Sequence, residues 1–193
     1  MRLLRFRNTQ SEQQSLSTRR LQLCRPELDD YEQWARLRHD SSAFLRPFEP
    51  SWTKNELSVA AYRLRMKQIQ AETNSARALH WFLKLNSPEM PLLGGITLSN
   101  IKLGAAKSGT LGYWMGERYA GQGFMGEAVD CVCDYAFKIK GLNRIEASTL
   151  LDNERSIGLL LSRGFQREGI GRQYLKINGE WCDHILFARL ASD

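Results

Sequence analysis

Three closely spaced glycines, Gly121, Gly123 and Gly126, constrain the fold of this chain more than any other sequence feature. A strand-like segment, 110–115, precedes them, and apolar residues at helical spacing follow them. At such a junction several backbone N–H groups point out of the helix start without an intrahelical partner. These groups and the helix dipole bind phosphate, and glycines keep side chains away from it. The sequence therefore predicts a phosphate or pyrophosphate site here, with Arg118 as a further charged contact.

The same glycines also spell the GxGxxG fingerprint of dinucleotide-binding folds, and Glu146 follows at about the distance of a ribose-binding carboxylate. The surrounding sequence argues against that interpretation. Only one strand–helix crossover follows the loop, five residues (116–120) separate the strand from the first glycine, and the chain ends in a predicted antiparallel hairpin. A purely structural role of the glycines, in a turn and in close packing, is the other alternative.

The order of predicted elements is typical of a mixed sheet and not of a doubly wound one. Periodicity predicts a strand, two helices, three strands, a helix, a strand, a helix and a terminal hairpin that turns at Asn178 and Gly179. A doubly wound sheet would alternate strand and helix throughout. We therefore expect an α/β (α+β) domain with an antiparallel meander, one βαβ crossover and a final antiparallel part. The expected ranges, apart from the helix after the glycines, are 20–25, 27–38, 53–71, 80–85, 92–99, 110–115, 142–149, 153–162, 165–177 and 181–190.

Two local signals refine this order. Pro47 and Pro50 interrupt regular structure and predict a loop in the segment FLRPFEP. Thr53 and Glu56 have the spacing of a capping box, which predicts that the second helix begins there.

Length and composition suit one globular domain. The 193 residues are 42% hydrophobic and 25% charged. No apolar run approaches the roughly 20 residues of a membrane-spanning helix, and the first residues lack a signal-peptide core. We expect a leader over 1–17, a domain over 18–193 and a cytoplasmic location without membrane association. The four cysteines contain no CxxC pair, which favours reduced thiols and no metal site; they are Cys24, Cys131, Cys133 and Cys182.

The net charge of +6 suggests an anionic partner. A nucleotide-like cofactor, a nucleoprotein target and a merely basic surface would each account for it. Direct sequence-specific binding of nucleic acid is not expected.

The glycine segment also resembles a known family. Arg118-x-x-Gly121-x-Gly123 matches the R/Q-x-x-G-x-G/A motif with which GNAT acetyltransferases hold the pyrophosphate of acetyl-CoA. The longer stretches LGYWMGERYAGQGFMGEAVDCVCDYAF, GLNRIEASTLLDNERSIGLLLSRGF and YLKINGEWCDHILFARL resemble the RimJ/RimL branch, which acetylates N-termini of ribosomal proteins. FLRPFEPSW and GGITLSNI are similar to the RimJ-type ribosomal-protein-alanine N-acetyltransferases. The resemblance extends over roughly 18–190, although antibiotic and polyamine acetyltransferases share the glycine loop.

The resemblance implies where acetyl-CoA would bind. The strand before the glycine loop and the strand after the next helix would splay apart, and the pantetheine arm would lie between them. No metal is implied. The residues implied for the cofactor are Trp114, Met115, Gly116, Arg118, Gly121, Gln122, Gly123, Phe124, Met125, Gly126, Asn153 and Ser156.

The resemblance also implies a catalytic role for Ser156. In the pattern N-x-x-S, here Asn153 to Ser156, the serine is the proton donor to the departing thiolate, while the asparagine contacts the cofactor. A capping role for Asn153 and an ordinary first-turn serine are the alternatives. The glutamate that precedes the tyrosine of the Y-L-x-N-G block is replaced by Gln173, which cannot accept a proton.

The acceptor site and the base are less constrained. We expect Phe48, Glu49, Trp52 and Tyr174 at the acceptor, with Phe44 as a further candidate wall residue. Glu49, Asp183 and His184 are conceivable bases or substrate anchors, although His184 is better interpreted as a structurally hydrogen-bonded strand histidine. An α-amine titrates near 7.7–8 and a lysine near 10.4, so the missing glutamate favours an α-amine acceptor.

The resulting hypothesis is N-terminal acetylation of a ribosomal protein, with alanine as the first residue and ribosome association as a possible consequence. An acetyltransferase for a small amine, either an antibiotic or a polyamine, is the alternative within the enzyme class. A non-catalytic ribosome-binding protein with the same fold is the alternative outside it.

Overall fold

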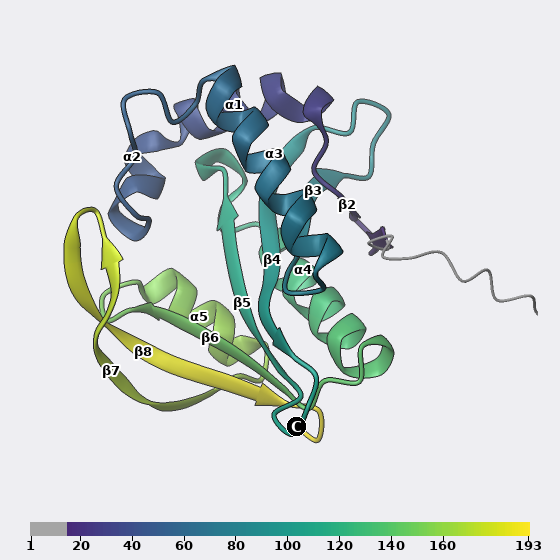
Figure 1. The fold of residues 1–193 in the computed structure, drawn as a ribbon, viewed down its shortest axis with the longest axis vertical. Coiled ribbons are helices and arrows are strands. Elements are labelled where there is room, and N and C mark those ends of the chain that lie inside the picture. The colour runs from purple at the N-terminus through teal and green to yellow at the C-terminus, as the bar shows by residue number, and fades with distance from the viewer. Residues whose placement is uncertain (1–14) are drawn as a thin grey trace, which may run out of the picture.

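An eight-stranded mixed sheet crosses the described residues, 15–193, of the computed structural model (Figure 1). Its spatial order is β1-β2-β3-β4-β5-β6-β8-β7, and only β5 and β6 are parallel. The expected meander, single crossover and final hairpin are therefore confirmed. The strands are β1 Leu16–Ser17, β2 Leu21–Cys24, β3 Leu79–Leu85, β4 Leu92–Lys102, β5 Ser108–Met115, β6 Arg144–Leu150, β7 Gln166–Ile177 and β8 Glu180–Leu190.

Helices cover both faces of this sheet. On one face α1 and α3 pack over β3 and β4, and on the other face α4 and α5 pack over the sheet and against each other's core residues. Short 3-10 turns precede α1, follow α2 and precede the glycine loop, and α4 continues into a π-helical turn at Tyr135–Ile139. The helices are α1 Tyr31–Asp40, α2 Ser42–Leu45, α3 Val59–Asn74, α4 Phe124–Asp134 and α5 Glu154–Ser162.

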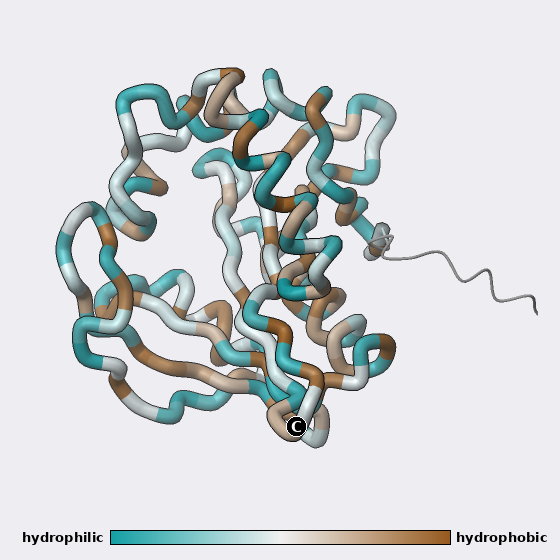
Figure 2. The backbone as a smooth tube through the Cα atoms, in the orientation of Figure 1, coloured by the Kyte–Doolittle hydropathy of each residue, from teal (hydrophilic) through white to brown (hydrophobic). Residues whose placement is uncertain are grey.

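Alternation along the strands divides the core into two clusters. In β3, Trp81 and Leu83 join the larger cluster with Val129 of α4, whereas Phe82 joins the smaller cluster with Trp34 of α1. Apolar residues accordingly recur along the strands, and α3 alternates between polar and apolar residues along its exposed length (Figure 2). Side chains on the two faces of the sheet thus belong to two separate core clusters.

Strands β5 and β6 pair over only part of their length. Ser108, Gly109 and Thr110 pair with Arg144 to Glu146, and beyond them β5 pairs only with β4 while β6 pairs only with β8. Figure 1 shows the two strands diverging toward the glycine loop and α5. This is the splay that the family resemblance implied.

Two helix predictions were wrong in detail. The second helix, α3, begins at Val59, because Ser58 is its N-cap and accepts a hydrogen bond from the Ala61 N–H at 3.2 Å. Thr53 and Glu56 do bond to each other, with 3.1 Å between Thr53 Oγ1 and Glu56 Oε2, but they close a turn and not a helix.

The segment expected to be only a loop contains the short helix α2 and the 3-10 turn Arg46–Phe48. Pro47 lies at the start of that turn, where its missing N–H and fixed φ cost nothing. Residues 1–14 of the expected leader lie outside the described residues, and Leu16 and Ser17 pair with β2. None of the described helices is long and apolar enough to cross a bilayer.

The junction of α5 and β7 offers a test of the core. Phe165 lies in the turn between α5 and β7 and is 2% exposed, whereas Leu161 within α5 is 53% exposed. We expect Phe165→Ala to lower the free energy of unfolding by about 3–5 kcal/mol, because it leaves a cavity in the larger cluster. Leu161→Ala should change it by about 0.5 kcal/mol or less. Urea denaturation measures both, and equal losses would contradict this packing.

Candidate functional site

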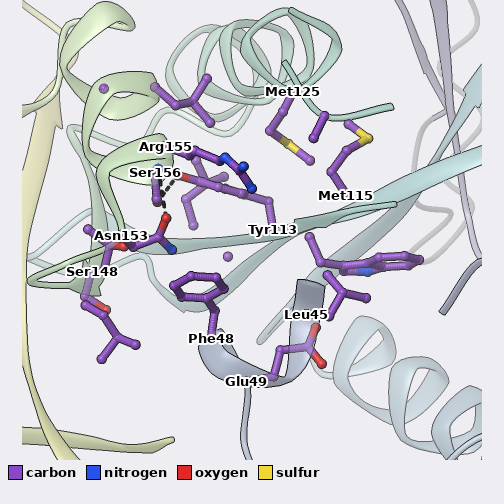
Figure 3. A pocket seen from close by; sticks show the side chains of 18 of the residues that line it. Leu45, Phe48, Glu49, Tyr113, Met115, Met125, Ser148, Asn153, Arg155 and Ser156 are labelled. Carbon is purple, nitrogen blue, oxygen red and sulfur yellow. Dashed lines mark hydrogen bonds between the residues drawn. The ribbon is translucent and has the colours of Figure 1, made fainter. Parts of the chain in front are cut away.

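A cavity of about 850 Å³ lies where β5 and β6 diverge (Figure 3). Its walls come from the end of β5, the glycine loop with the start of α4, the end of β6 with the start of α5, the segment 44–49, and the β7–β8 hairpin. Figure 3 shows Tyr113 and Ser156 directed toward each other on one side, and Phe48 and Glu49 on another. Segments far apart in the sequence thus form one continuous chamber.

Most of the predicted site residues line this cavity. Five do not: Gly116, Arg118, Gln122, Trp52 and Tyr174. The predicted residues on the wall are Phe48, Glu49, Trp114, Met115, Gly121, Gly123, Phe124, Met125, Gly126, Asn153 and Ser156. These residues share one cavity, and their binding roles stay predictions.

The glycine loop has the backbone that an anion site requires. Gly121 and Gly123 have φ of 75° and 78°, in the left-handed region that glycine adopts without strain. Gly123 is the N-cap of α4, and no side chain caps this end of the helix. The first N–H groups of α4 have no intrahelical acceptor, and Phe124, Met125 and Gly126 lie on the cavity wall. This helix start can therefore accept an anion.

Arg20 holds the loop from a distant part of the chain. Its backbone N–H and its Nε donate to the Glu127 carboxylate at 2.9 and 2.7 Å, and its Nη1 donates to the Gln122 carbonyl at 3.1 Å. Its guanidinium also lies over the Phe124 ring, 4.5 Å from the centroid. Burial alone would raise the pKa of Glu127, but hydrogen bonds from Thr18 and Arg20 lower it. The sequence gives no indication of this contact, because the partners are 107 positions apart.

Ser156 has a partner that sequence analysis missed. Its Oγ lies 2.7 Å from the Tyr113 Oη, across the gap between α5 and β5. Burial raises the pKa of Tyr113 to about 12, so the phenol stays protonated at neutral pH. Asn153 Oδ1 accepts a hydrogen bond from the Ser156 backbone N–H at 3.1 Å. Asn153 is thus the N-cap of α5, which is the capping role that the sequence offered as an alternative. The Tyr113 hydroxyl can donate to Ser156 and leave the serine hydrogen free for a ligand.

On the cavity wall formed by the segment 44–49, Glu49 is held by Arg38. The guanidinium donates to both carboxylate oxygens, at 3.2 and 2.5 Å, and Trp52 Nε1 donates at 2.8 Å. Arg38 is 3% exposed and lies 4.6 Å from the Trp52 ring and 5.0 Å from the Trp114 ring. Trp52 therefore supports Glu49 and does not line the cavity. The sequence contains a pattern that indicates burial of Arg38, because Arg38 follows Trp34 by four residues and therefore lies on the same face of α1.

The hairpin completes the chamber and contains a wide bulge. The Asn178 N–H donates to the Glu49 carbonyl at 2.9 Å, which ties the hairpin turn to the segment 44–49. Between Gly171 and Leu175 the register of β7 shifts, and the Gln173 N–H donates to Asp183 Oδ1 at 2.8 Å. Asp183 thus stabilises the bulge.

Within residues 15–193, no group of three or more His, Cys, Asp or Glu side chains is arranged to hold a metal ion. The four cysteines are unpaired, and burial raises the pKa of Cys133 to about 12.

Comparisons with known proteins agree with this geometry. The family model described as an acetyltransferase (GNAT) domain matches residues 20–166. The [ribosomal protein uS5]-alanine N-acetyltransferase of Escherichia coli is 31% identical over 166 residues, which are 86% of this chain and 82% of the relative.

Two solved structures have the same fold over nearly the whole chain. The ribosomal-protein-S5-alanine acetyltransferase of Vibrio fischeri superposes with a TM-score of 0.84 at 28% identity, covering 94% of this chain and 98% of the other. RimJ of Mycobacterium smegmatis, in complex with CoA-disulfide, gives a TM-score of 0.84 at 29% identity, covering 89% of this chain and 82% of the other.

The Tyr113–Ser156 pair predicts a pH dependence of stability. The folded-state pKa of Tyr113 is about 12 and the ordinary value is 10, so the unfolded chain loses this proton first as the pH rises. The protonated phenol contributes fully to the free energy of unfolding below pH 10, and this contribution is lost as the pH rises to about 12. We expect Tyr113→Phe to lose less stability than the wild type across this interval, as measured by urea denaturation. Parallel losses would contradict the buried phenol.

Proposed function

The chain belongs to the GNAT acetyltransferase family, and on that premise we propose that it transfers the acetyl group of acetyl-CoA to the N-terminal α-amine of a ribosomal protein, with alanine as the first residue. The observation that carries this proposal is the continuous cavity from the glycine loop, past Ser156, to the acceptor segment. One end suits a pyrophosphate, the middle suits a thioester, and the other end can admit an amine. The relatives that acetylate ribosomal protein termini support the acceptor class.

The chain's own backbone fits the coenzyme. The uncapped N–H groups at the start of α4 would hold the pyrophosphate, with Gly121 and Gly123 leaving room for it. Beyond Thr110, the edge of β5 that faces the gap has no strand partner, so its N–H and C=O groups near Trp114 can bond the amides of pantetheine. Arg118 and Gln122 lie off the cavity wall and would act from the loop surface.

The reaction proposed is direct attack of a neutral amine on the thioester carbonyl. An α-amine is substantially neutral near physiological pH, whereas a lysine amine is not. Ser156 would donate to the departing thiolate, and Tyr113 would orient the serine hydroxyl through the 2.7 Å contact. Acetyl-CoA supplies the activated acetyl group when bound.

The acceptor wall supports an N-terminal substrate. Phe48, Leu175 and Ile177 form an apolar surface that suits a small first side chain such as alanine. Glu49, fixed by Arg38, presents a carboxylate that can orient an ammonium group. The net charge of +6 favours approach to a nucleoprotein particle.

Acetyl transfer can be tested with matched peptides. We expect thiol release with an alanine-starting peptide, and none when its α-amine is blocked and only an internal lysine is free. Ser156→Ala should lower kcat by about 100-fold, the lower end for a positioned proton donor, while the exposed Ser192→Ala should not. Turnover with lysine alone, or with spermidine alone, would overturn the acceptor assignment.

The glycine loop predicts a loss of coenzyme affinity. Gly123→Ala places a side chain at φ 78°, which costs about 1–2 kcal/mol. Because the methyl group also stands beside the proposed anion site, we expect the Kd of coenzyme A to rise about tenfold in calorimetric titrations. Gly141→Ala, at φ 65° with no atom within 4 Å of the added carbon and away from the cavity wall, is the matched control. Equal affinities of the two variants would contradict the site.

A further inference from the structure

The proposed reaction needs an acceptor for a proton of the ammonium group. Gln173 cannot fill this role, because an amide does not take up a proton at neutral pH. Among the described residues, the ionisable side chains on the cavity wall are Glu49, Tyr113, Glu117, Tyr119, Arg155 and His184. A proton acceptor must come from this set or from water.

Four of these six groups are unsuitable as the proton acceptor. Arg155 has no lone pair to offer, and Tyr113 is protonated and bonded to Ser156. Glu49 already accepts from Arg38 and Trp52, so its charge is balanced and three of its acceptor sites are occupied. Glu117 is solvent-exposed next to the glycine loop, at the phosphate end of the cavity.

His184 has one ring nitrogen committed and one free. The residue is 2% exposed, and its Nδ1 lies 2.9 Å from the Cys182 carbonyl oxygen. A carbonyl oxygen only accepts hydrogen bonds, so Nδ1 carries the hydrogen and Nε2 carries the lone pair. Within the part of the chain that the structure describes, Nε2 has no hydrogen-bond partner. The ring is held in place by its neighbours, including Tyr174 at 5.8 Å between centroids.

The position of His184 on the sheet suits an incoming amine. Its neighbour Ile185 points into the larger core cluster, on the face covered by α4 and α5. His184 therefore points to the opposite face, together with its register partner Leu150. Ser156 reaches the cavity from α5, on the side of Ile185. A proton acceptor and a proton donor thus approach the gap from opposite faces of the sheet.

We infer that His184 is the residue that takes the proton from the acceptor amine, directly or through one water molecule. This inference rests on the acetyl-transfer function proposed above. Nε2 takes one proton from the ammonium group, and the freed lone pair forms the C–N bond to the thioester carbon. As the C–S bond breaks, Ser156 gives its proton to the departing thiolate, and the second proton of the nitrogen passes through water to restore the serine hydroxyl. The imidazolium then returns its proton to solvent.

The tautomer of His184 can be tested without any acceptor. Labelling the histidines with ¹⁵N and recording long-range ¹H–¹⁵N correlations of the full chain separates the Nδ1–H and Nε2–H forms. The chain contains three histidines, so a His184→Gln spectrum assigns the signal. We expect the Nδ1–H form. A hydrogen on Nε2 in the neutral ring would overturn the inference, whatever the acceptor is.

Substitutions then separate proton transfer from structure. His184→Asn keeps an N–H near Nδ1 for the Cys182 carbonyl but removes Nε2, and His184→Gln places a non-basic amide near Nε2. We expect both to lower kcat by about 100-fold with the KM for the peptide changed less than threefold. The control is His39→Asn, whose side chain is 80% exposed, and it should match the wild type.

The outcomes are distinguishable from failure of the proposed function. Wild-type kcat in a folded His184→Asn or His184→Gln variant overturns the role of His184 and leaves acetyl transfer intact. If the wild type acetylates a lysine or a polyamine instead, the same variants are assayed with that amine. If it acetylates no amine, the proposed function fails, and the tautomer alone decides whether Nε2 is a proton acceptor.

Discussion

The parallel pairing of β5 with β6 covers only residues 108–110 and 144–146, and the rest of the site depends on where it stops. Each strand keeps its antiparallel partner on the far side, so neither loses its place in the sheet when the two diverge. The divergence leaves one backbone edge of β5 without a strand partner among residues 15–193. Such an edge is costly to bury and is satisfied by water or by a ligand with amide groups. The cavity is therefore a direct consequence of the register.

Different polar groups reach the gap between β5 and β6 from the two faces of the sheet. Groups that reach the gap from the α4 and α5 side are the helix start at Gly123 and the Tyr113–Ser156 pair. Groups on the other side are the Glu49 segment and His184, with the hairpin joined to Glu49 by the Asn178 hydrogen bond. In the proposed reaction, the anionic leaving group and the cationic acceptor would therefore meet different side chains. Their protons need not compete for one side chain.

Charged pairs in this protein position the walls of the site. Arg20 and Glu127 fix the glycine loop, and Arg38 and Glu49 fix the acceptor segment. Arg38 is buried among aromatic rings, so its removal would leave the Glu49 carboxylate without its counter-charge. In both pairs the carboxylate belongs to a segment that lines the cavity, whereas the arginine lies behind it. Both arginines therefore hold segments that line the cavity.

Local sequence patterns were enough to predict the mixed sheet, the single crossover, the helix start at the glycines and the family. These features depend on local periodicity and on a motif of adjacent residues, which the chain carries before it folds. The sequence also singled out Ser156, which lies on the cavity wall, although its catalytic role stays a prediction. The predicted start of α3 was wrong, because Thr53 and Glu56 have the spacing of a cap but form a turn. In contrast, the contact between Tyr113 and Ser156 and the position of His184 on the cavity wall could be learned only from the folded chain. Those features depend on strand register and on residues far apart in the sequence, such as Tyr113 and Ser156 at 43 positions, which no local pattern encodes.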